Sequence, residues 1–243
     1  MGMVDLHCHL LPGVDDGART MEDALALASA AVANGITRAV LTPHVYPGVF
    51  DNKISTILPT FRRYRAALAA AGIPLEIYLG GEVRIHPDMF QLLAADELPV
   101  LGLLGKERVV LLELPDGHIP PGVEVVCRMF CKHGIRLLIA HPERNKQVMR
   151  DPKRIRRLVD SGCLLQVTAA SIVGAFGPQV AACAQHLLVN RLVSVVATDA
   201  HNLRHRPPLL KEARDALSRQ FGPDLACQLT EGLPGEIITA RTD

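Results

Sequence analysis

The chain lacks the features that mark a membrane, secreted or nucleic-acid-binding protein. No apolar run among its 243 residues approaches the length of a membrane span, and the first residues lack the basic and then apolar segment of a secretory signal. Lys and Arg number 26 against 25 Asp and Glu, a net charge of +1, which argues against general binding to nucleic acid or to membrane surfaces. We therefore expect a cytoplasmic protein that neither enters a membrane nor binds nucleic acid.

Cysteine spacing and composition give no sign of a zinc knuckle or of a linker between domains. Cys127 and Cys131 are one helical turn apart, but no matching Cys or His pair follows, so we expect reduced thiols packed in the core. Hydrophobic residues make up 49% of the chain, enough for a large core. Two domains are possible at this length, but α/β barrels of this size are routinely one domain. We expect residues 1–243 to form a single domain.

Short apolar runs alternate with helix-like segments seven times along the chain. The predicted strands are Val4–His7, Arg38–Leu41, Leu75–Leu79, Val109–Leu112, Arg136–Ile139, Leu164–Val167 and Val193–Ala197. The predicted helices are Met21–Ala33, Pro59–Ala71, Met89–Ala95, Val123–His133, Pro152–Asp160, Gln179–Val189 and Pro208–Gln220. Buried strands that each precede a helix are typical of a parallel sheet with helices outside. Seven such units predict an α/β fold, a closed or nearly closed (β/α)7 barrel.

The first predicted strand carries two histidines in alternation with apolar residues. Because strand side chains alternate between faces, Asp5, His7 and His9 are predicted to share one face, and the apolar residues between them to share the other. Imidazole nitrogens suit zinc, iron and manganese. Asp5 is a candidate for the carboxylate that orients a metal-bound histidine. Two solvated histidines near a terminus remain the alternative for this motif taken alone.

Polar side chains with metal-binding chemistry follow six of the seven predicted strands. The carboxyl ends of the strands of a parallel barrel share one face, and barrel enzymes carry out their chemistry there. Chance would scatter His, Asp and Glu among the helices and both rims. The joint placement therefore predicts a metal site. Its candidate ligands are His7, His9, Asp16, His44, Glu82, Glu113, His141, Asp199 and His201.

Nine candidate ligands are too many for one tetrahedral ion, which takes four protein ligands or three plus water. They suffice for two or three ions that share carboxylates, and mixed His and carboxylate donors fit manganese, iron or zinc. Clustered ions of this kind catalyse phosphoester hydrolysis. Arg144 and Arg206 follow candidate ligands by three and five residues, and the planar guanidinium suits phosphate. A surface salt bridge is the alternative for each arginine.

Cyclic amidohydrolases are a second class of barrel enzyme that begins with His-x-His. Many of them bridge two metals with a carboxylated lysine at the end of a strand. This chain has six lysines, and none lies at a predicted strand end, whereas Glu82 or Glu113 is available as a bridge. The sequence favours phosphoester chemistry without excluding the amidohydrolase alternative.

The ordered motifs of the chain resemble those of the polymerase-and-histidinol-phosphatase (PHP) superfamily. More narrowly, they resemble the bacterial tyrosine-protein phosphatases of the CpsB/YwqE type, which are encoded with capsule and exopolysaccharide genes. The resemblance runs from about residue 3 to residue 208. The segments that carry it are His7-Cys8-His9, Val14-Asp15-Asp16-Gly17-Ala18, Thr42-Pro43-His44, Gly81-Glu82, Glu113-Leu114-Pro115, His118-Ile119-Pro120-Pro121-Gly122, His141-Pro142-Glu143-Arg144-Asn145, Gln166-Val167-Thr168-Ala169-Ala170-Ser171, Asp199-Ala200-His201-Asn202 and Arg206-Pro207-Pro208.

The resemblance implies a distorted seven-stranded barrel with a trinuclear, usually manganese-dependent centre. Matched motif by motif, it implies a first ion on His7, His9, Glu82 and Asp199, a second on Glu82, Glu113 and His141, and a third on Asp16, His44 and His201. Arg144 and Arg206 would hold the phosphate, and a metal-bridging hydroxide would attack phosphorus in line and expel tyrosinate. The implied substrate is a phosphotyrosine protein, an autophosphorylating bacterial tyrosine kinase that controls polysaccharide synthesis and export.

Cysteine positions give one check that is independent of the resemblance. Thiol-dependent tyrosine phosphatases use Cys-x5-Arg, and the residues six positions after the cysteines here are Val14, His133, Leu137, Ala169, Val189 and Leu233. Any phosphatase activity must therefore come from the metals. Two alternatives stay open: a PHP phosphoesterase for a small molecule such as histidinol phosphate, and a non-catalytic scaffold stabilised by metal. Tyr46 and Phe50 are candidates for contact with a phosphotyrosine ring, with simple loop packing as the alternative.

Overall fold

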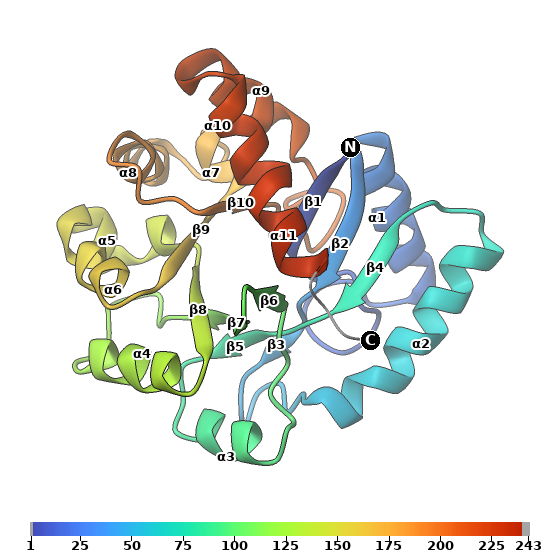
Figure 1. The fold of residues 1–243 in the computed structure, drawn as a ribbon. Helices are drawn as coiled ribbons and strands as arrows, with labels where there is room; N and C mark the ends of the chain where they lie inside the picture. Colours follow the sequence, from blue (N-terminus) through green and yellow to red (C-terminus); the bar gives the residue numbers. More distant parts are fainter. Residues whose placement is uncertain (1, 240–243) are drawn as a thin grey trace.

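The computed structural model describes residues 2–239 and has a barrel of seven parallel strand positions with helices around it (Figure 1). The seven predicted strands are all present, so the expectation of an α/β barrel is confirmed. They are β1 (Met3–Cys8), β2 (Ile36–Leu41), β4 (Glu76–Leu79), β7 (Glu107–Glu113), β8 (Ile135–Ala140), β9 (Leu164–Thr168) and β10 (Val195–Ala197). The domain predicted over 1–243 includes residues 1 and 240–243, which lie outside the described residues.

Two of the seven wall positions are broken strands, which accounts for the distortion of the barrel. After Thr42 and Pro43, β2 continues as β3 (His44–Val45), and after Gly80 and Gly81, β4 continues as β5 (Glu82–Arg84). Strands β1, β2 and β4 form one sheet, while β3, β5, β7, β8, β9 and β10, with β6 (Gly102–Leu104) paired to β7, form the other. Proline has no N–H to donate to a ladder. A Cβ on Gly80 would lie 2.7 Å from Val40 Cγ1, so the second break needs glycine.

The helices cover the outside of the barrel, and most agree with the predicted segments. They are α1 (Met21–Ala33), α2 (Ile54–Ala70), α3 (Met89–Ala94), α4 (Val123–Lys132), η2 (Pro152–Ile155) with α6 (Arg156–Asp160), α8 (Pro178–Val189) and α9 (Lys211–Phe221). The first has the predicted bounds, because Thr20 Oγ1 accepts a hydrogen bond from Asp23 N at 3.2 Å and caps it. None of the helices within residues 2–239 is long and apolar enough to cross a membrane.

Several short elements were not predicted, because they span too few residues to show a period. They are β3, β5, β6 (Gly102–Leu104), η1 (Pro142–Arg144), α5 (Lys146–Arg150), α7 (Ala169–Ile172), α10 (Pro223–Cys227), η3 (Gln228–Gly232) and α11 (Leu233–Thr239). Among them, β6 pairs antiparallel with the start of β7. This places β6 at the amino end of the barrel, opposite the strand ends that carry the candidate ligands.

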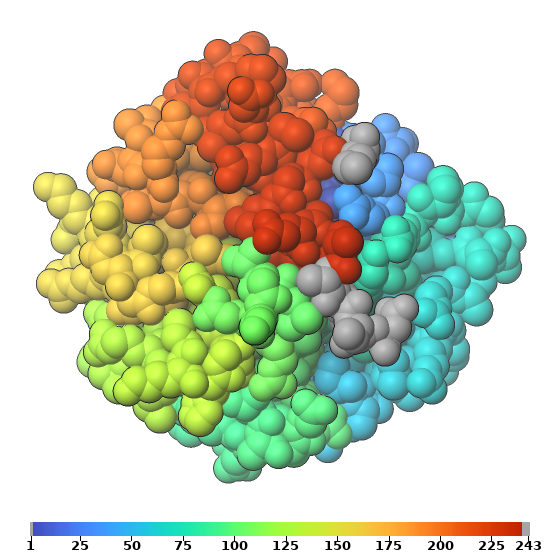
Figure 2. All heavy atoms as spheres, in the orientation of Figure 1, coloured from blue at the N-terminus to red at the C-terminus, as the bar shows by residue number. Residues whose placement is uncertain are grey.

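The last helix closes the amino end of the barrel. Ile237 and Ile238 of α11 are buried in the same apolar cluster as Val4 and Leu6, which line the barrel interior. Figure 2 shows this C-terminal segment lying across the centre of the molecule. The motifs quoted from the sequence end at about residue 208, and the structure gives α11, beyond them, a packing role. Polar chemistry is thereby confined to the opposite end.

The fit of β6 against α11 leads to a prediction about stability. A Cβ on Gly102 would lie 2.0 Å from the carbonyl oxygen of Ile237, so Gly102→Ala must displace α11. We expect the free energy of unfolding of the metal-free protein, measured in urea, to fall by about 1–3 kcal/mol. Gly232→Ala is the matched control, because the nearest atom to its Cβ lies at 3.9 Å. Equal stability of the two variants would contradict this packing of α11.

Candidate metal centre

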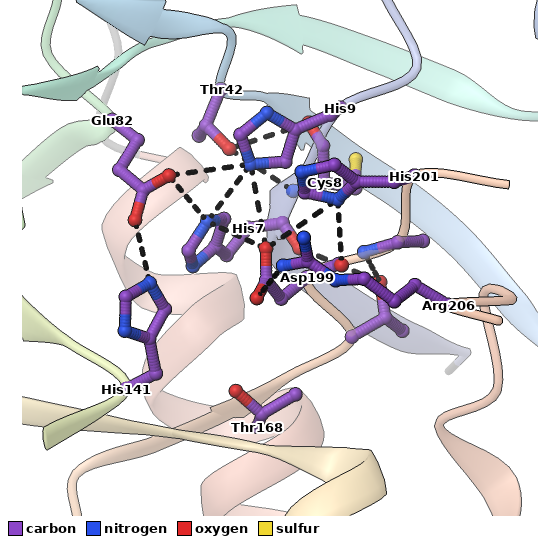
Figure 3. A network of polar contacts seen from close by, with 12 residues as sticks. His7, Cys8, His9, Thr42, Glu82, His141, Thr168, Asp199, His201 and Arg206 are labelled. Atoms are coloured by element: carbon purple, nitrogen blue, oxygen red, sulfur yellow. Dashed lines mark hydrogen bonds and ion pairs between the residues drawn. The ribbon is translucent and has the colours of Figure 1, made fainter. Parts of the chain in front are cut away.

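The structure brings the nine candidate ligands to the carboxyl end of the barrel, where Figure 3 shows His7, His9, Glu82, His141, Asp199 and His201 turned toward one another. The side chains come from β1 and the loop after it, from the ends of β7 and β8, from the second halves of the broken strands and from the loop after β10. Each lies far from most of the others in sequence. Barrel closure therefore assembles the cluster.

An extra residue in β1 changes which residues share a face with the two histidines. From Asp5 to Cys8, β1 advances three residues while the facing segment of β2 advances two. This bulge breaks the simple alternation of side chains. Within it, Leu6 packs inside the barrel, and after it, Leu10 packs in the outer core against the helices.

The prediction that Asp5 shares a face with the two histidines and orients one of them is wrong. The Asp5 carboxylate accepts hydrogen bonds from Thr198 N at 3.0 Å and His7 N at 3.3 Å, and from the Thr198 hydroxyl. It therefore ties β1 to the end of β10 through the backbone. The predicted common apolar face is also wrong, because the bulge separates Leu6 from Cys8.

Four buried donors converge as closely as the ligands of one ion. His7 Nε2 lies 3.2 Å from Glu82 Oε2 and 3.3 Å from Asp199 Oδ1, and His9 Nε2 lies 3.3 and 3.4 Å from the same two oxygens. The two Nε2 atoms are 3.2 Å apart. Four tetrahedral donors about 2.0–2.1 Å from an ion stand roughly 3.3–3.4 Å from one another. The spacing of the four atoms thus fits a single metal ion.

A second group of donors lies on the other side of His9. Asp16 Oδ1 lies 3.4 Å from both His44 Nε2 and His201 Nε2, and the His9 and His201 rings are 3.8 Å apart between centroids. Donor atoms of these four residues all lie within 4.8 Å of one another. The sequence placed Asp16, His44 and His201 in one group, and the structure brings them together with His9 beside them.

Glu82 connects the donor groups. Its Oε1 lies 2.8 Å from His141 Nε2, and its Oε2 lies 3.0 Å from His44 Nδ1. Glu113 joins His44 and Glu82 in a third close group, and its Oε2 also pairs with Arg84 Nη1 at 3.0 Å. The resemblance implied one ion on Glu82, Glu113 and His141. In the structure, Glu113 and His141 each lie close to Glu82, and Glu113 also lies close to His44.

The hydrogen bonds around the cluster orient three histidine rings so that each Nε2 faces into it. The Nδ1 atoms of His7, His9 and His201 face Gln166 Oε1, Asp15 Oδ2 and the Asp199 carbonyl at 3.0, 2.8 and 3.0 Å. With its Nδ1–H donating to such an acceptor, a neutral imidazole directs an unprotonated Nε2 at the cluster, the form that binds a metal ion. Within residues 2–239, buried atoms without a hydrogen-bond partner include Glu82 Oε2, Asp199 Oδ1 and His201 Nε2. The donor set therefore fits bound cations.

Asp15 and Gln166 are supporting residues that the sequence analysis did not assign. Asp15 also accepts hydrogen bonds from Gly17 N and His44 N, both at 3.0 Å, and so ties two donor groups together. Gln166 Oε1 also accepts from His141 N at 3.2 Å. Both residues lie within the sequence motifs that carry the family resemblance. For Asp15, its position next to the candidate ligand Asp16 could have indicated the supporting role.

In the metal-free protein, shifts in pKa keep Glu82 and Asp199 ionised and act in opposite directions on His44 and His201. Burial opposes ionisation of Glu82 and Asp199, but the charge of His7 and hydrogen bonds from the neighbouring histidines hold both pKa values well below the usual range. Burial also lowers the pKa of His44, yet the neighbouring carboxylates of Asp16 and Glu82 raise it to about 9. Burial and the charge of His9 lower the pKa of His201 to about 4.

The two arginines predicted to hold phosphate meet at one carboxylate oxygen. Arg144 Nη1 and Arg206 Nη2 both donate to Asp199 Oδ2, while Oδ1 of the same carboxylate faces the donor group of His7 and His9. The arginine side chains keep 31% and 24% exposure, so they line the open side of the cluster. Asp199 thus holds the two guanidinium groups at the edge of the candidate metal centre.

Two candidate ligands have left-handed backbone that non-glycine residues rarely adopt. His141 has φ of 32° and Asp199 has φ of 54°. Buried side chains pin the segment after His141: Glu143 Oε1 accepts from Thr168 N at 2.9 Å, and Asn145 Nδ2 donates to Pro115 O at 2.7 Å. Such strain persists only where the surroundings hold it, and it gathers at functional sites.

A closed α/β barrel with clustered His and carboxylate donors at the carboxyl ends of its strands defines the class of metal-dependent barrel enzymes. The family model described as capsular polysaccharide synthesis, CpsB/CapC, matches residues 3–239. The chain belongs to this family, as its sequence motifs indicated.

Named relatives within the family are tyrosine-protein phosphatases. The chain is 35% identical to tyrosine-protein phosphatase YwqE of Bacillus subtilis over 229 residues, 94% of this chain and 89% of the relative. It is 30% identical to tyrosine-protein phosphatase CpsB of Streptococcus pneumoniae over 241 residues, 97% of this chain and 98% of the relative. A solved structure of these metal-dependent tyrosine phosphatases matches with a TM-score of 0.91 and 34% identity, covering 99% of this chain and 96% of the other.

A more distant likeness bears on the fold alone. An organophosphorus hydrolase variant from Deinococcus radiodurans matches with a TM-score of 0.60 and 16% identity over 98% of this chain and 93% of that one. The barrel is therefore shared with hydrolases whose sequences have diverged widely. A shared barrel does not by itself fix the reaction.

The hydrogen bond between Asp15 and His9 predicts a loss of metal affinity on mutation. Asp15→Asn removes the carboxylate that orients the imidazole, and we expect metal affinity to fall about 10- to 100-fold. Competition with a chelating indicator measures it. Asp51→Asn is the control, because Asp51 bonds Gly48 N in an exposed loop. Unchanged affinity in Asp15→Asn would refute the orienting role.

The pKa of about 9 for His44 predicts a pH dependence of stability in the metal-free protein. The folded pKa lies above the unfolded value near 6.5, so the stabilisation is complete below about pH 6.5 and is lost as pH rises through 9. We expect the free energy of unfolding of chelator-treated protein to decrease from pH 6.5 to 9, with a shallower decrease in His44→Gln. Equal slopes in urea denaturation would contradict it. Metal affinity should rise over the same window, because bound imidazole must be unprotonated.

Proposed function

We propose that this protein is a metal-dependent tyrosine phosphatase that hydrolyses phosphotyrosine. The observation that carries the proposal is Asp199, whose two oxygens join the donor group of His7 and His9 to the guanidinium groups of Arg144 and Arg206. The candidate metal ligands and the arginine N–H groups for phosphate oxygens thus lie on the two sides of one carboxylate. Relatives that are 30–35% identical over nearly the whole chain carry the same activity in their names.

The residues of the chain have separate tasks in this reaction. Arg144 and Arg206 hold the non-reacting phosphate oxygens, for which their forked N–H groups are suited. Glu82 and Asp199 stay ionised and His201 stays neutral near pH 7, which keeps them available as cation donors. Clustered divalent ions, when bound, supply charge neutralisation and a low-pKa water. Tyrosine has a pKa near 10, so tyrosinate is a fair leaving group without a dedicated general acid.

The thiol next to the two histidines has no part in the proposed reaction. Cys8 is buried, its Sγ lies 3.5 Å from the carbonyl oxygen of Val40, and burial raises its pKa well above the usual value. A neutral thiol that packs away from the cluster is no nucleophile. Its environment supports hydrolysis by way of the cation-binding donors.

The finer parts of the proposal rest on the donor chemistry and on the family. Mixed imidazole and carboxylate donors support two or three manganese ions, with iron or zinc as alternatives. The names of the tyrosine-protein phosphatase relatives support a phosphotyrosine protein as the substrate, and the description of the family as one of capsular polysaccharide synthesis supports a role in capsule production. We propose a bacterial tyrosine autokinase that controls capsule or exopolysaccharide production, acted on in the cytoplasm. We further propose that the whole chain forms one metallophosphatase domain.

Metal removal and replacement test the proposed reaction. Chelator-treated protein is assayed with phosphotyrosine, phosphoserine and histidinol phosphate after addition of manganese, zinc or magnesium. We expect manganese to restore phosphotyrosine hydrolysis in the wild type and not in His141→Ala, which loses the contact with Glu82. Turnover of histidinol phosphate alone would instead assign a small-molecule phosphoesterase. Metal binding without any turnover would support a scaffold.

Removal of either arginine should impair catalysis and leave the donors in place. We expect Arg144→Ala or Arg206→Ala to lower kcat/KM for phosphotyrosine by about 10²–10³-fold, as for loss of one transition-state donor. Metal content, measured by elemental analysis, should remain that of the wild type. The control is Arg156→Ala, which removes an exposed pair with Asp160 on α6. Wild-type kcat/KM in both arginine variants would rule out phosphate binding by these groups.

A further inference from the structure

Three aromatic side chains lie beside groups of the candidate site, and they differ in what they contact. The Phe50 ring stacks on the His44 ring, with 5.5 Å between centroids and 13° between planes. Tyr46 lies under Arg84, whose guanidinium carbon is 5.2 Å from the ring centroid. Phe176 lies under Arg144 at the same distance, 5.2 Å. Of the three rings, Phe176 is the one that contacts an arginine proposed to bind phosphate.

The contacts of Phe50 and Tyr46 give those rings a supporting role. One face of Phe50 is covered by His44, a candidate ligand. Arg84 over Tyr46 pairs with Glu113, another candidate ligand, at 3.0 Å. Both rings therefore pack against groups that hold the metal donors. The sequence analysis considered these two residues for contact with a substrate ring, and it did not consider Phe176.

Backbone hydrogen bonds hold the segment that carries Phe176. Gly174 and Gly177 flank the segment with φ of 80° and 91°, a conformation that L side chains rarely adopt. Ala175 N donates to Ala170 O at 2.9 Å, and Gly177 N donates to Gly174 O at 3.1 Å. The segment is thus a hydrogen-bonded turn between α7 and α8. It holds a half-buried phenyl ring at the edge of the site, in contact with Arg144.

We propose that Phe176 forms the wall against which the aromatic ring of the leaving group packs, so that the site prefers aryl to alkyl phosphate monoesters. This inference rests on the proposed function. Arg144 donates to Asp199 through Nη1, which leaves other N–H groups of its guanidinium available to phosphate oxygens, while the guanidinium lies over the Phe176 ring. Because the Phe176 centroid lies 5.2 Å from the Arg144 guanidinium carbon, Phe176 is the neighbouring ring available to an aryl group on a phosphate held by Arg144. Aromatic pairs adopt centroid separations of about 4.5–7 Å.

Phosphonates separate recognition of the ring from chemistry, because their carbon–phosphorus bond is not a phosphoester. Phenylphosphonate and methylphosphonate are titrated by calorimetry into the metal-loaded wild type, Phe176→Ala and Phe176→Leu. In Phe176→Ala we expect the Kd of phenylphosphonate to rise about three- to tenfold, the scale of one aromatic pair, and that of methylphosphonate to stay unchanged. Phe176→Leu, which keeps apolar bulk, should give an intermediate rise for phenylphosphonate.

Phe50→Ala is the matched control, because it removes a second phenyl ring at the site. We expect it to leave the ratio of the two Kd values as in the wild type. Equal rises of both Kd values in Phe176→Ala would overturn the proposal, because Phe176 would then only position Arg144. A change of the ratio in Phe50→Ala and not in Phe176→Ala would also overturn it.

Failure of this inference is distinguishable from failure of the proposed function. Wild-type protein that hydrolyses phosphotyrosine while Phe176→Ala keeps the wild-type Kd ratio would refute the role of Phe176 and leave the phosphatase in place. Wild-type protein that neither hydrolyses phosphotyrosine nor binds either phosphonate would refute both. Selective loss of phenylphosphonate affinity in Phe176→Ala would establish the ring-binding wall by binding alone.

Discussion

The structure depends on the junction of β10 and β1, where closure of the barrel and assembly of the site are the same event. Asp199 N donates to His7 O at 2.7 Å, and His9 N donates to Ala200 O at 2.8 Å, which joins the last wall strand to the first. The Asp199 side chain then reaches the donor group with one oxygen and two arginines with the other. A partly closed barrel would therefore lack the cluster, because His7 and His9 lie about 190 residues before Asp199 and His201 in the sequence.

Burial of the carboxylates makes the cluster energetically costly. Ionised carboxylates in a low-dielectric interior need compensating charge. In the metal-free protein, shared protons on the histidines supply part of it, which is why burial fails to raise the pKa values of Glu82 and Asp199. Bound cations would replace those protons. The apolar side chains of the barrel interior and α11 fill the amino end of the barrel. The polar donors therefore lie above a hydrophobic core and are open to solvent on the side of Arg144 and Arg206.

Prediction from the sequence succeeded where a pattern extends over many residues. The strand–helix alternation identified the seven wall strands, and the position of His, Asp and Glu after the strands identified the donors that converge. It failed for two-residue strands such as β3, which have no readable period, and for the face of Asp5, because one inserted residue in β1 reverses the alternation. Asp15 and Gln166 were not assigned, because the ring nitrogen that a side chain contacts depends on neighbours distant in sequence.

The sequence by itself determined the class of fold, the family and the chemical nature of the donors, because residue type and order carry that information directly. Only the tertiary structure decided which oxygen of Asp199 faces the arginines, which ring nitrogen each histidine directs into the cluster, and that Phe176 lies against Arg144. These are distances between side chains brought together by barrel closure and by left-handed turns. Hydrophobic periodicity determines that the strands form, but the bulge, the two broken strands and the glycine-flanked turn determine where each functional atom lies.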